Sequence, residues 1–127
     1  MENRNSNFKI LIQKRVFEYS AGMIRFIDSL PHDISSKAIK SQLVRSATSI
    51  GANIVEAQTA SSKRDFIRFI QYSLKSANET LYWMGLLEAA KGISDFRFTN
   101  LLRETKELAN IVASIVLTAK GKRNSNF

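Results

Sequence analysis

Few side chains in this sequence are suited to catalysis. Its 127 residues include one histidine, His32, and no cysteine, which excludes thiolate chemistry and every metal site built on several histidines. His32 follows Pro31 in an expected turn, and nothing near it resembles the strand-to-helix elbow that presents a nucleophilic serine. The five glycines occur singly, whereas phosphate-binding loops need them clustered. We therefore expect no enzyme activity, no metal and no cofactor.

A line of polar residues crosses an otherwise apolar stretch in the second quarter of the chain. Its members are Arg45, Ser49, Asn53 and Glu56. Residues three or four apart are neighbours on a helix, so the arginine and the glutamate can hydrogen-bond the small polar groups between them. The line is interpreted as a structural network that sets register within or between bundles, and the alternative is a ligand site.

Positive charge is the other chemical feature. Nineteen lysines and arginines outnumber eleven acidic residues, for a formal charge of +8. Such a surplus favours a polyanionic partner, nucleic acid above all, although it also serves solubility.

The elements that must position these residues are four helices in a single domain over residues 1–127. Turn residues interrupt the chain near Pro31, at 57–62, near Gly92 and after Gly121. Between them, apolar residues recur three or four apart, as on one face of a helix. The spacing predicts helices over roughly 8–30, 34–58, 62–91 and 95–120, with mobile tails at 1–6 and 121–127. Short connections favour an antiparallel up-down four-helix bundle.

Capping residues support these boundaries. Ser62 is placed to cap the third helix, and Ser94 or Asp95 to cap the fourth. Gly92 and Gly121 stand where a left-handed residue would end a helix. The apolar stripe of the first helix is expected at Ile12, Val16, Met23, Ile27 and Leu30, with Phe17 and Ile24 beside it.

The bundle topology collects basic residues at one end. The start of the first helix, the connection between the second and third, and the end of the fourth should meet there, while Lys75 continues the row along the third helix. Tyr72 or Tyr82 could stack on an unpaired base. The alternative is a solvated face. The predicted nucleic-acid-binding residues are Lys14, Arg15, Lys63, Arg64, Arg68, Lys75, Lys120, Lys122 and Arg123.

The second helix carries apolar or small residues on two faces. A helix of this kind is usually buried all round, and one monomer cannot cover both faces, so we expect contact between subunits. The third helix adds a second stripe. The alternative is a wide core-facing surface on an irregular bundle. The predicted interface residues are Val44, Thr48, Gly51, Ala52, Val55, Phe69, Tyr72 and Trp83.

Three absences from the sequence bear on the cellular compartment. The apolar runs are too short for a membrane span. The first seven residues contain no apolar stretch typical of a signal peptide, and cysteine is absent. These observations favour the cytoplasm and no membrane partner.

The motifs resemble those of a known family. The segment from Gln42 to Ala57, together with Ser62, residues 65–67 and residues 78–84, is similar to the signature of the 23S rRNA intervening-sequence proteins. Ala57 stands where many members have glycine, and Ser76 where a glutamate is expected. The resemblance implies an all-α bundle that assembles into a ring-like homopentamer without known enzymatic activity.

That family also looks related to the accessory variability determinant of diversity-generating retroelements, a basic pentameric bundle that works with a reverse transcriptase and RNA. Two hypotheses follow. The first is an oligomeric accessory protein that binds nucleic acid, RNA more than DNA of defined sequence, because no recognition-helix motif occurs. The second is an interaction scaffold that acts with a protein partner such as a reverse transcriptase, without binding nucleic acid itself.

Overall fold

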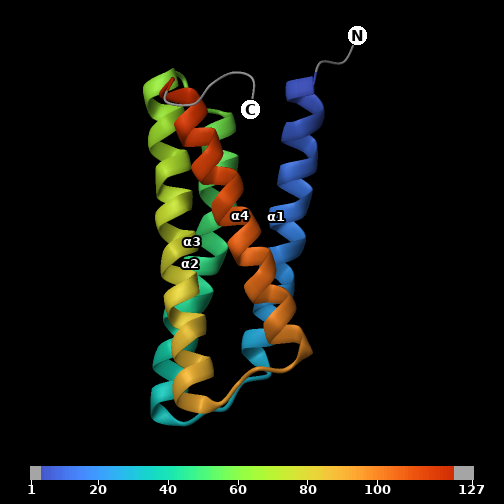
Figure 1. The fold of residues 1–127 in the computed structure, drawn as a ribbon, viewed down its shortest axis with the longest axis vertical. Coiled ribbons are helices and arrows are strands. Elements are labelled where there is room, and N and C mark those ends of the chain that lie inside the picture. Colours follow the sequence, from blue (N-terminus) through green and yellow to red (C-terminus); the bar gives the residue numbers. More distant parts are fainter. Residues whose placement is uncertain (1–3, 122–127) are drawn as a thin grey trace.

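The chain folds into four helices joined by short connections. The computed structural model describes residues 4–121, which form α1 (Arg4–Asp28), α2 (Ile34–Gln58), α3 (Lys63–Lys91) and α4 (Phe96–Ala119) (Figure 1). No strand occurs in this described part of the chain. The predicted all-α fold with four helices is confirmed.

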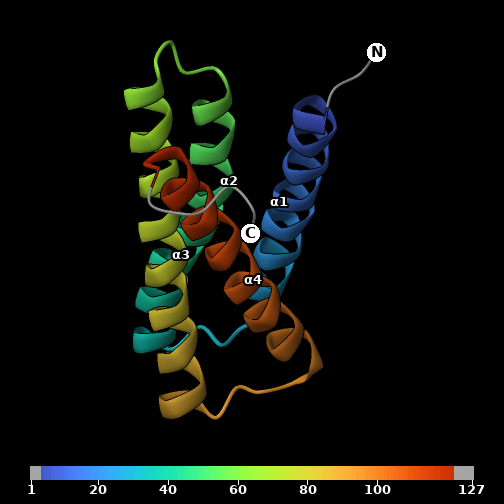
Figure 2. The same cartoon turned by 45° about the horizontal axis from the view of Figure 1, so that its top comes forward.

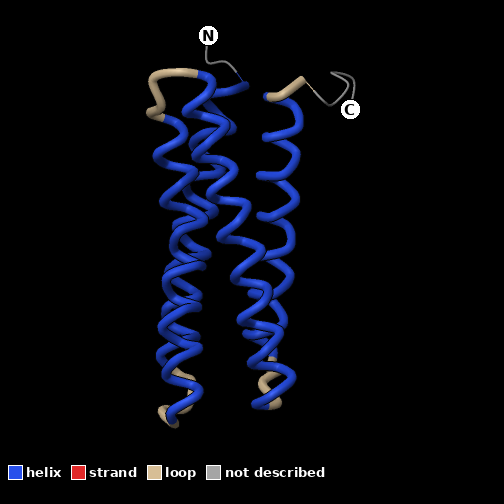
Figure 3. The backbone as a smooth tube through the Cα atoms, turned by 90° about the vertical axis from the view of Figure 1, so that its left-hand side faces the viewer, coloured by secondary structure: helices blue, strands red, loops and turns tan. Residues whose placement is uncertain are grey.

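Successive helices run in opposite directions along a common axis. Figure 1 shows α1 descending from one end of the molecule, α2 returning to it, and α3 and α4 repeating the two directions. The start of α1, the connection at residues 59–62 and the end of α4 therefore lie at the same end, here called the terminal end, as the side view also shows (Figure 3). This arrangement gathers segments that are far apart in the sequence.

Side-chain and glycine caps fix the helix ends. The carboxylates of Asp33 and Asp95 and the hydroxyl of Ser62 each accept the backbone N–H of the residue three positions further on. Such a bond satisfies one of the donors that a helix start leaves without a partner. Gly92 (φ 66°) and Gly121 (φ 70°) adopt the left-handed conformation that glycine takes without strain. Ser62, Asp95, Gly92 and Gly121 are caps that the sequence predicts, whereas the cap at Asp33 is an addition.

The start of α1 departs from the prediction. The helix begins at Arg4 instead of near residue 8, so residues 4–6, predicted as part of a mobile tail, are helical. No proline or glycine interrupts residues 4–21, and a helix already nucleated by buried residues extends at little cost until a breaker stops it. The remaining tail positions, 1–3 and 122–127, lie outside the described residues.

The core runs the length of the bundle and takes residues from all four helices. Met23, Leu43, Met84 and Leu108 are each completely buried, and burial of a side chain of this size contributes about 1.5–3 kcal/mol. The predicted apolar stripe of α1 is buried throughout. Phe17, expected beside that stripe, is instead 76% exposed.

The helices α2 and α3 pack closely through small residues. Ala47 and Ala77 are fully buried. Two hydrogen bonds join the helices. Ser73 of α3 donates to the carbonyl oxygen of Ile50 of α2 at 2.8 Å, and the hydroxyl oxygens of Thr80 of α3 and Ser46 of α2 are 2.9 Å apart. Small side chains let two helix backbones approach, and these bonds satisfy the buried hydroxyl groups of Ser46, Ser73 and Thr80.

The helix α1 is attached to α2 at a glycine and leans away from the other three helices toward its start (Figure 2). A Cβ atom added to Gly51 would lie 3.1 and 3.2 Å from two carbon atoms of Val16. The absence of a side chain at Gly51 therefore sets how closely α1 can approach α2.

We expect opposite effects when the two mid-helix glycines are replaced by alanine. Gly85 of α3 has open space around it, so Gly85→Ala should raise the free energy of unfolding by about 0.5–1 kcal/mol through helix propensity. Gly51→Ala should lower it, because overpacking against the stiff Val16 costs about 1–3 kcal/mol and outweighs the same gain. Urea unfolding followed by circular dichroism measures both. An equal gain for the two variants would contradict the close contact.

Candidate nucleic-acid interface

Exposed cations gather at the terminal end, as the sequence predicts. Lys63 and Arg64 at the start of α3, Lys9 near the start of α1 and Lys120 directly after α4 are exposed there, and Lys14 is exposed nearer the middle of α1. None of the five forms an ion pair within the described residues. The predicted Lys122 and Arg123 lie outside the part of the chain that the structure describes. The positive charge at this end is therefore available to a ligand.

Arg15 serves a different purpose from the one predicted. Its guanidinium donates two hydrogen bonds of 2.7 Å to the carboxylate of Glu104 and a third of 2.7 Å to Glu107. Hydrogen bonding raises the pKa of Arg15 and lowers that of Glu104. The bidentate pair joins α1 to α4, and two acidic groups neutralise this arginine.

A row of basic residues continues from the terminal end along α3. Lys63, Arg64, Arg68 and Gln71 line a shallow hollow of about 510 Å³. Arg68 lies 3.3 Å from the carboxylate of Asp65, so its charge is partly compensated. Lys75 is exposed two turns beyond Arg68. The row therefore presents three uncompensated cations and one that is shared.

The polar line of α2 does not form the side-chain network that the sequence predicts. Ser49 donates to the carbonyl oxygen of Arg45, and Asn53 donates to that of Ser49, because short polar side chains on a helix readily reach the carbonyl one turn back. Glu56 is exposed.

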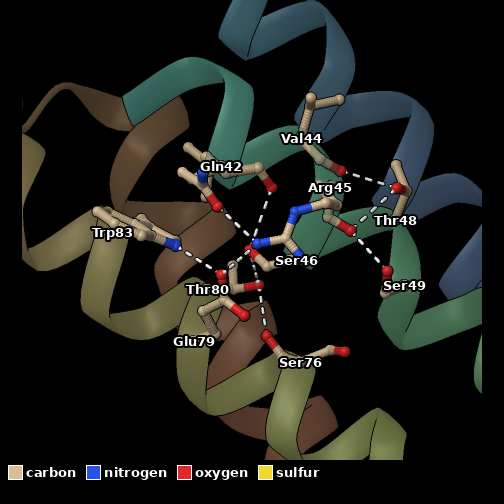
Figure 4. A network of polar contacts seen from close by, with 11 residues as sticks. Gln42, Val44, Arg45, Ser46, Thr48, Ser49, Ser76, Glu79, Thr80 and Trp83 are labelled. Atoms are coloured by element: carbon tan, nitrogen blue, oxygen red, sulfur yellow. Dashed lines mark hydrogen bonds and ion pairs between the residues drawn. The ribbon is translucent and has the colours of Figure 1, made fainter. Parts of the chain in front are cut away.

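The network that does form connects α2 to α3 (Figure 4). Arg45 donates to Gln42 at 2.5 Å and to Glu79 at 3.1 Å. The same carboxylate oxygen of Glu79 accepts the indole N–H of Trp83 at 2.9 Å. Sequence reasoning missed Gln42 and Glu79, although the spacing of Gln42 to Arg45 and of Glu79 to Trp83 is that of helix neighbours.

The predicted subunit face of α2 is partly covered by α1. Gly51 is buried against α1, whereas Ala52 and Val55 are exposed. A groove of about 650 Å³ runs between the two helices, and its lining is mostly apolar. It includes the predicted Thr48, Gly51, Ala52 and Val55 together with Ile10 and Phe17 of α1.

The remaining predicted interface residues differ in how far they are buried within the chain. Val44, Phe69 and Trp83 pack against the core and are partly buried. Tyr72 is 43% exposed, and its ring meets that of Phe69 edge-on. The second stripe of α3 therefore packs partly against the core of its own chain and is partly exposed.

These features define an all-α protein of four helices with a basic end. Within the described residues, no group of three or more histidine, aspartate or glutamate side chains is placed to hold a metal ion. None of the four described helices is both long and apolar enough to cross a membrane.

The comparisons assign a family to this fold. A model of the family described as 23S rRNA-intervening sequence protein matches residues 9–114. The chain therefore belongs to the 23S rRNA-intervening sequence protein family, as the resemblance indicated. No curated protein matches it.

A solved structure is similar over most of the chain. It is the crystal structure of a protein of unknown function from the S23 ribosomal protein family of Bacteroides thetaiotaomicron. The two chains are 30% identical and superpose with a TM-score of 0.77, over 85% of this chain and 96% of that one. Neither description names an enzyme.

The pair of Arg15 and Glu104 predicts a pH-dependent stability. Because the pKa of Glu104 is lowered by folding, the pair stabilises the fold above the ordinary glutamate pKa, and this stabilisation is lost as the pH falls through the lowered value. Glu104→Gln should cost about 1 kcal/mol at neutral pH, a small figure because both partners are partly exposed.

Urea titrations at neutral pH and near pH 3 measure this effect. The difference between the variant and the wild type should shrink at the lower pH. Glu107→Gln is the matched control, since Glu107 accepts a single bond and is 52% exposed, and it should cost less. A difference that is the same at both pH values would contradict the role of the ion pair.

Proposed function

We propose that this chain is a non-enzymatic, self-assembling four-helix protein that binds nucleic acid through its terminal end. The observation that carries the proposal is the group of exposed cations at that end that form no ion pair within the described residues, including Lys9, Lys63, Arg64 and Lys120. Contacts to phosphates supply most of the affinity of non-specific binding, and they need only such cations.

The preferred ligand is RNA over DNA of defined sequence. Sequence-specific DNA binding usually places a helix or a strand pair in the major groove, in recognisable motifs, and the sequence shows no such motif. The cations here lie on α1, on α3 and directly after α4, an arrangement that suits the irregular backbone of a folded RNA.

Assembly is the second part of the proposal. Ile10, Phe17, Ala52 and Val55 leave apolar surface in and around the groove between α1 and α2, and large exposed apolar patches usually mark contact sites. A ring of five copies, which the family resemblance implies, would present the terminal end five times. Several weak sites on one ligand give an avidity well above that of one site.

A protein partner is the alternative, and one observation favours it. Phe8 (47% exposed) and Leu11 (66% exposed) add apolar surface at the start of α1. Phe8 also lines a second groove, of about 560 Å³, with Ile111 and Ile115 of α4. A scaffold that acts with a partner such as a reverse transcriptase would use this surface without contacting nucleic acid.

Charge reversal at the terminal end should abolish RNA binding. The variant combines Lys63→Glu and Arg64→Glu, and the control combines Arg25→Glu and Lys37→Glu, which are exposed basic residues at the opposite end of the bundle. Fluorescence anisotropy with a labelled structured RNA at about 50 and 200 mM salt measures the affinity. Wild type and control should bind at the lower salt and weaken steeply at the higher. Absence of wild-type binding at the lower salt would contradict the proposal and favour the protein scaffold.

A charge in the groove between α1 and α2 should disrupt assembly. Ala52 is exposed on α2, so Ala52→Glu leaves the monomer core intact while it places a carboxylate in the proposed subunit contact, where an unpaired charge is costly. Multi-angle light scattering should report a smaller species than the wild type. An unchanged oligomer with an unchanged helical circular dichroism spectrum would rule out this contact.

A further inference from the structure

The basic row of α3 ends at an exposed aromatic side chain. Arg64, Arg68, Lys75 and Tyr82 are spaced by four, seven and seven residues. Each of these intervals is close to a whole number of helical turns, so the four side chains lie on one face of α3. The ring of Tyr82 is 60% exposed and contributes little to the core. Packing therefore does not account for a tyrosine at this position, in line with three cations.

The ring of Tyr82 is held in place from the inner side. The Trp83 ring lies 5.1 Å from it, centroid to centroid, with 72° between the planes. This edge-to-face geometry is favourable for aromatic pairs. Trp83 is itself fixed by its hydrogen bond to Glu79, which Arg45 reaches from α2. The chain of contacts from α2 thus supports one edge of an aromatic ring that remains open to solvent.

The surroundings of Tyr82 are compatible with a polyanion. The nearest acidic group along the helix, Glu79, is paired with Arg45 at 3.1 Å, which compensates its charge. Asn78, one turn before Tyr82, is exposed, and its amide can donate and accept hydrogen bonds. From Arg64 to Tyr82 the helix rises about 27 Å, the length of about eight stacked nucleotides of one strand. This span is within the range known for single-strand sites.

We propose that the row Arg64, Arg68 and Lys75 tracks the backbone of a single-stranded polynucleotide and that Tyr82 stacks on one of its bases. The proposal rests on the nucleic-acid binding proposed above and specifies its ligand class. Stacking needs a base that is not already enclosed in a duplex, because the faces of paired bases are covered by their neighbours. The cations supply affinity for any polyanion, and Tyr82 supplies the preference for unpaired bases.

The test compares three probes of equal length, each of about twenty nucleotides with a terminal fluorescein. They are an oligothymidylate, a strand of abasic sites and a thymidine–adenine duplex. At low salt the wild type should bind the oligothymidylate about five- to 150-fold more tightly than the abasic strand. Tyr82→Ala should remove that difference, and Tyr82→Phe should keep it.

Tyr72→Ala is the matched control, since Tyr72 is the other exposed tyrosine of α3 (43%) and its ring contacts Phe69 instead. It should leave the preference for bases unchanged. The emission of Trp83, the one tryptophan of the sequence, gives a readout at the site: the oligothymidylate should change it, and the abasic strand should leave it as it is.

The outcomes separate the two proposals. Equal binding of the oligothymidylate and the abasic strand, or a preference that survives Tyr82→Ala, overturns the stacking role while binding to the terminal end stands. The stacking role of Tyr82 is also overturned if Tyr72→Ala loses the preference for the oligothymidylate over the abasic strand while Tyr82→Ala keeps it. If the wild type binds none of the three probes, nor the structured RNA, both proposals are wrong.

Discussion

The close contact between α2 and α3 is the constraint on which the rest of the structure depends. Small side chains there allow the backbones to approach, and hydroxyl groups such as those of Ser73 and Thr80 reach partners on the opposite helix. A buried hydroxyl without a partner would be costly, so these bonds also fix the register of the two helices. That register brings Arg45 to Glu79 and thereby places Trp83 and the ring of Tyr82.

Local signals in the sequence were sufficient for most of the fold. A helix period, a serine cap at Ser62 and a glycine at Gly92 report on neighbouring residues, and each acts within one or two turns. The start of α1 was harder to locate because residues 4–8 contain several possible caps, Asn5, Ser6 and Asn7, and no breaker to choose among them. A helix can begin at any of these positions, and the buried stripe, which starts only at Ile12, does not decide among them.

The candidate site was predictable only where it depends on charge and topology. The clustering of cations at one end follows from the up-and-down course of the chain. The pairing of Arg15 with Glu104 joins residues from the first and last helices, and no sequence period relates them. The polar line of α2 was misread for a related reason, since a pattern within one helix does not show that Arg45 reaches across to another while Ser49 turns back to its own backbone.

The lean of α1 has a consequence for how the molecule responds to its partners. The first turns of α1, where Phe8, Ile10 and Leu11 are exposed and the buried stripe begins only at Ile12, are suited to open locally while the rest of the helix stays packed in the core. Any partner that covers α1 binds the closed form and not the open one. By mass action such a partner stabilises the whole chain, so the apparent melting temperature becomes a property of the complex and of its concentration.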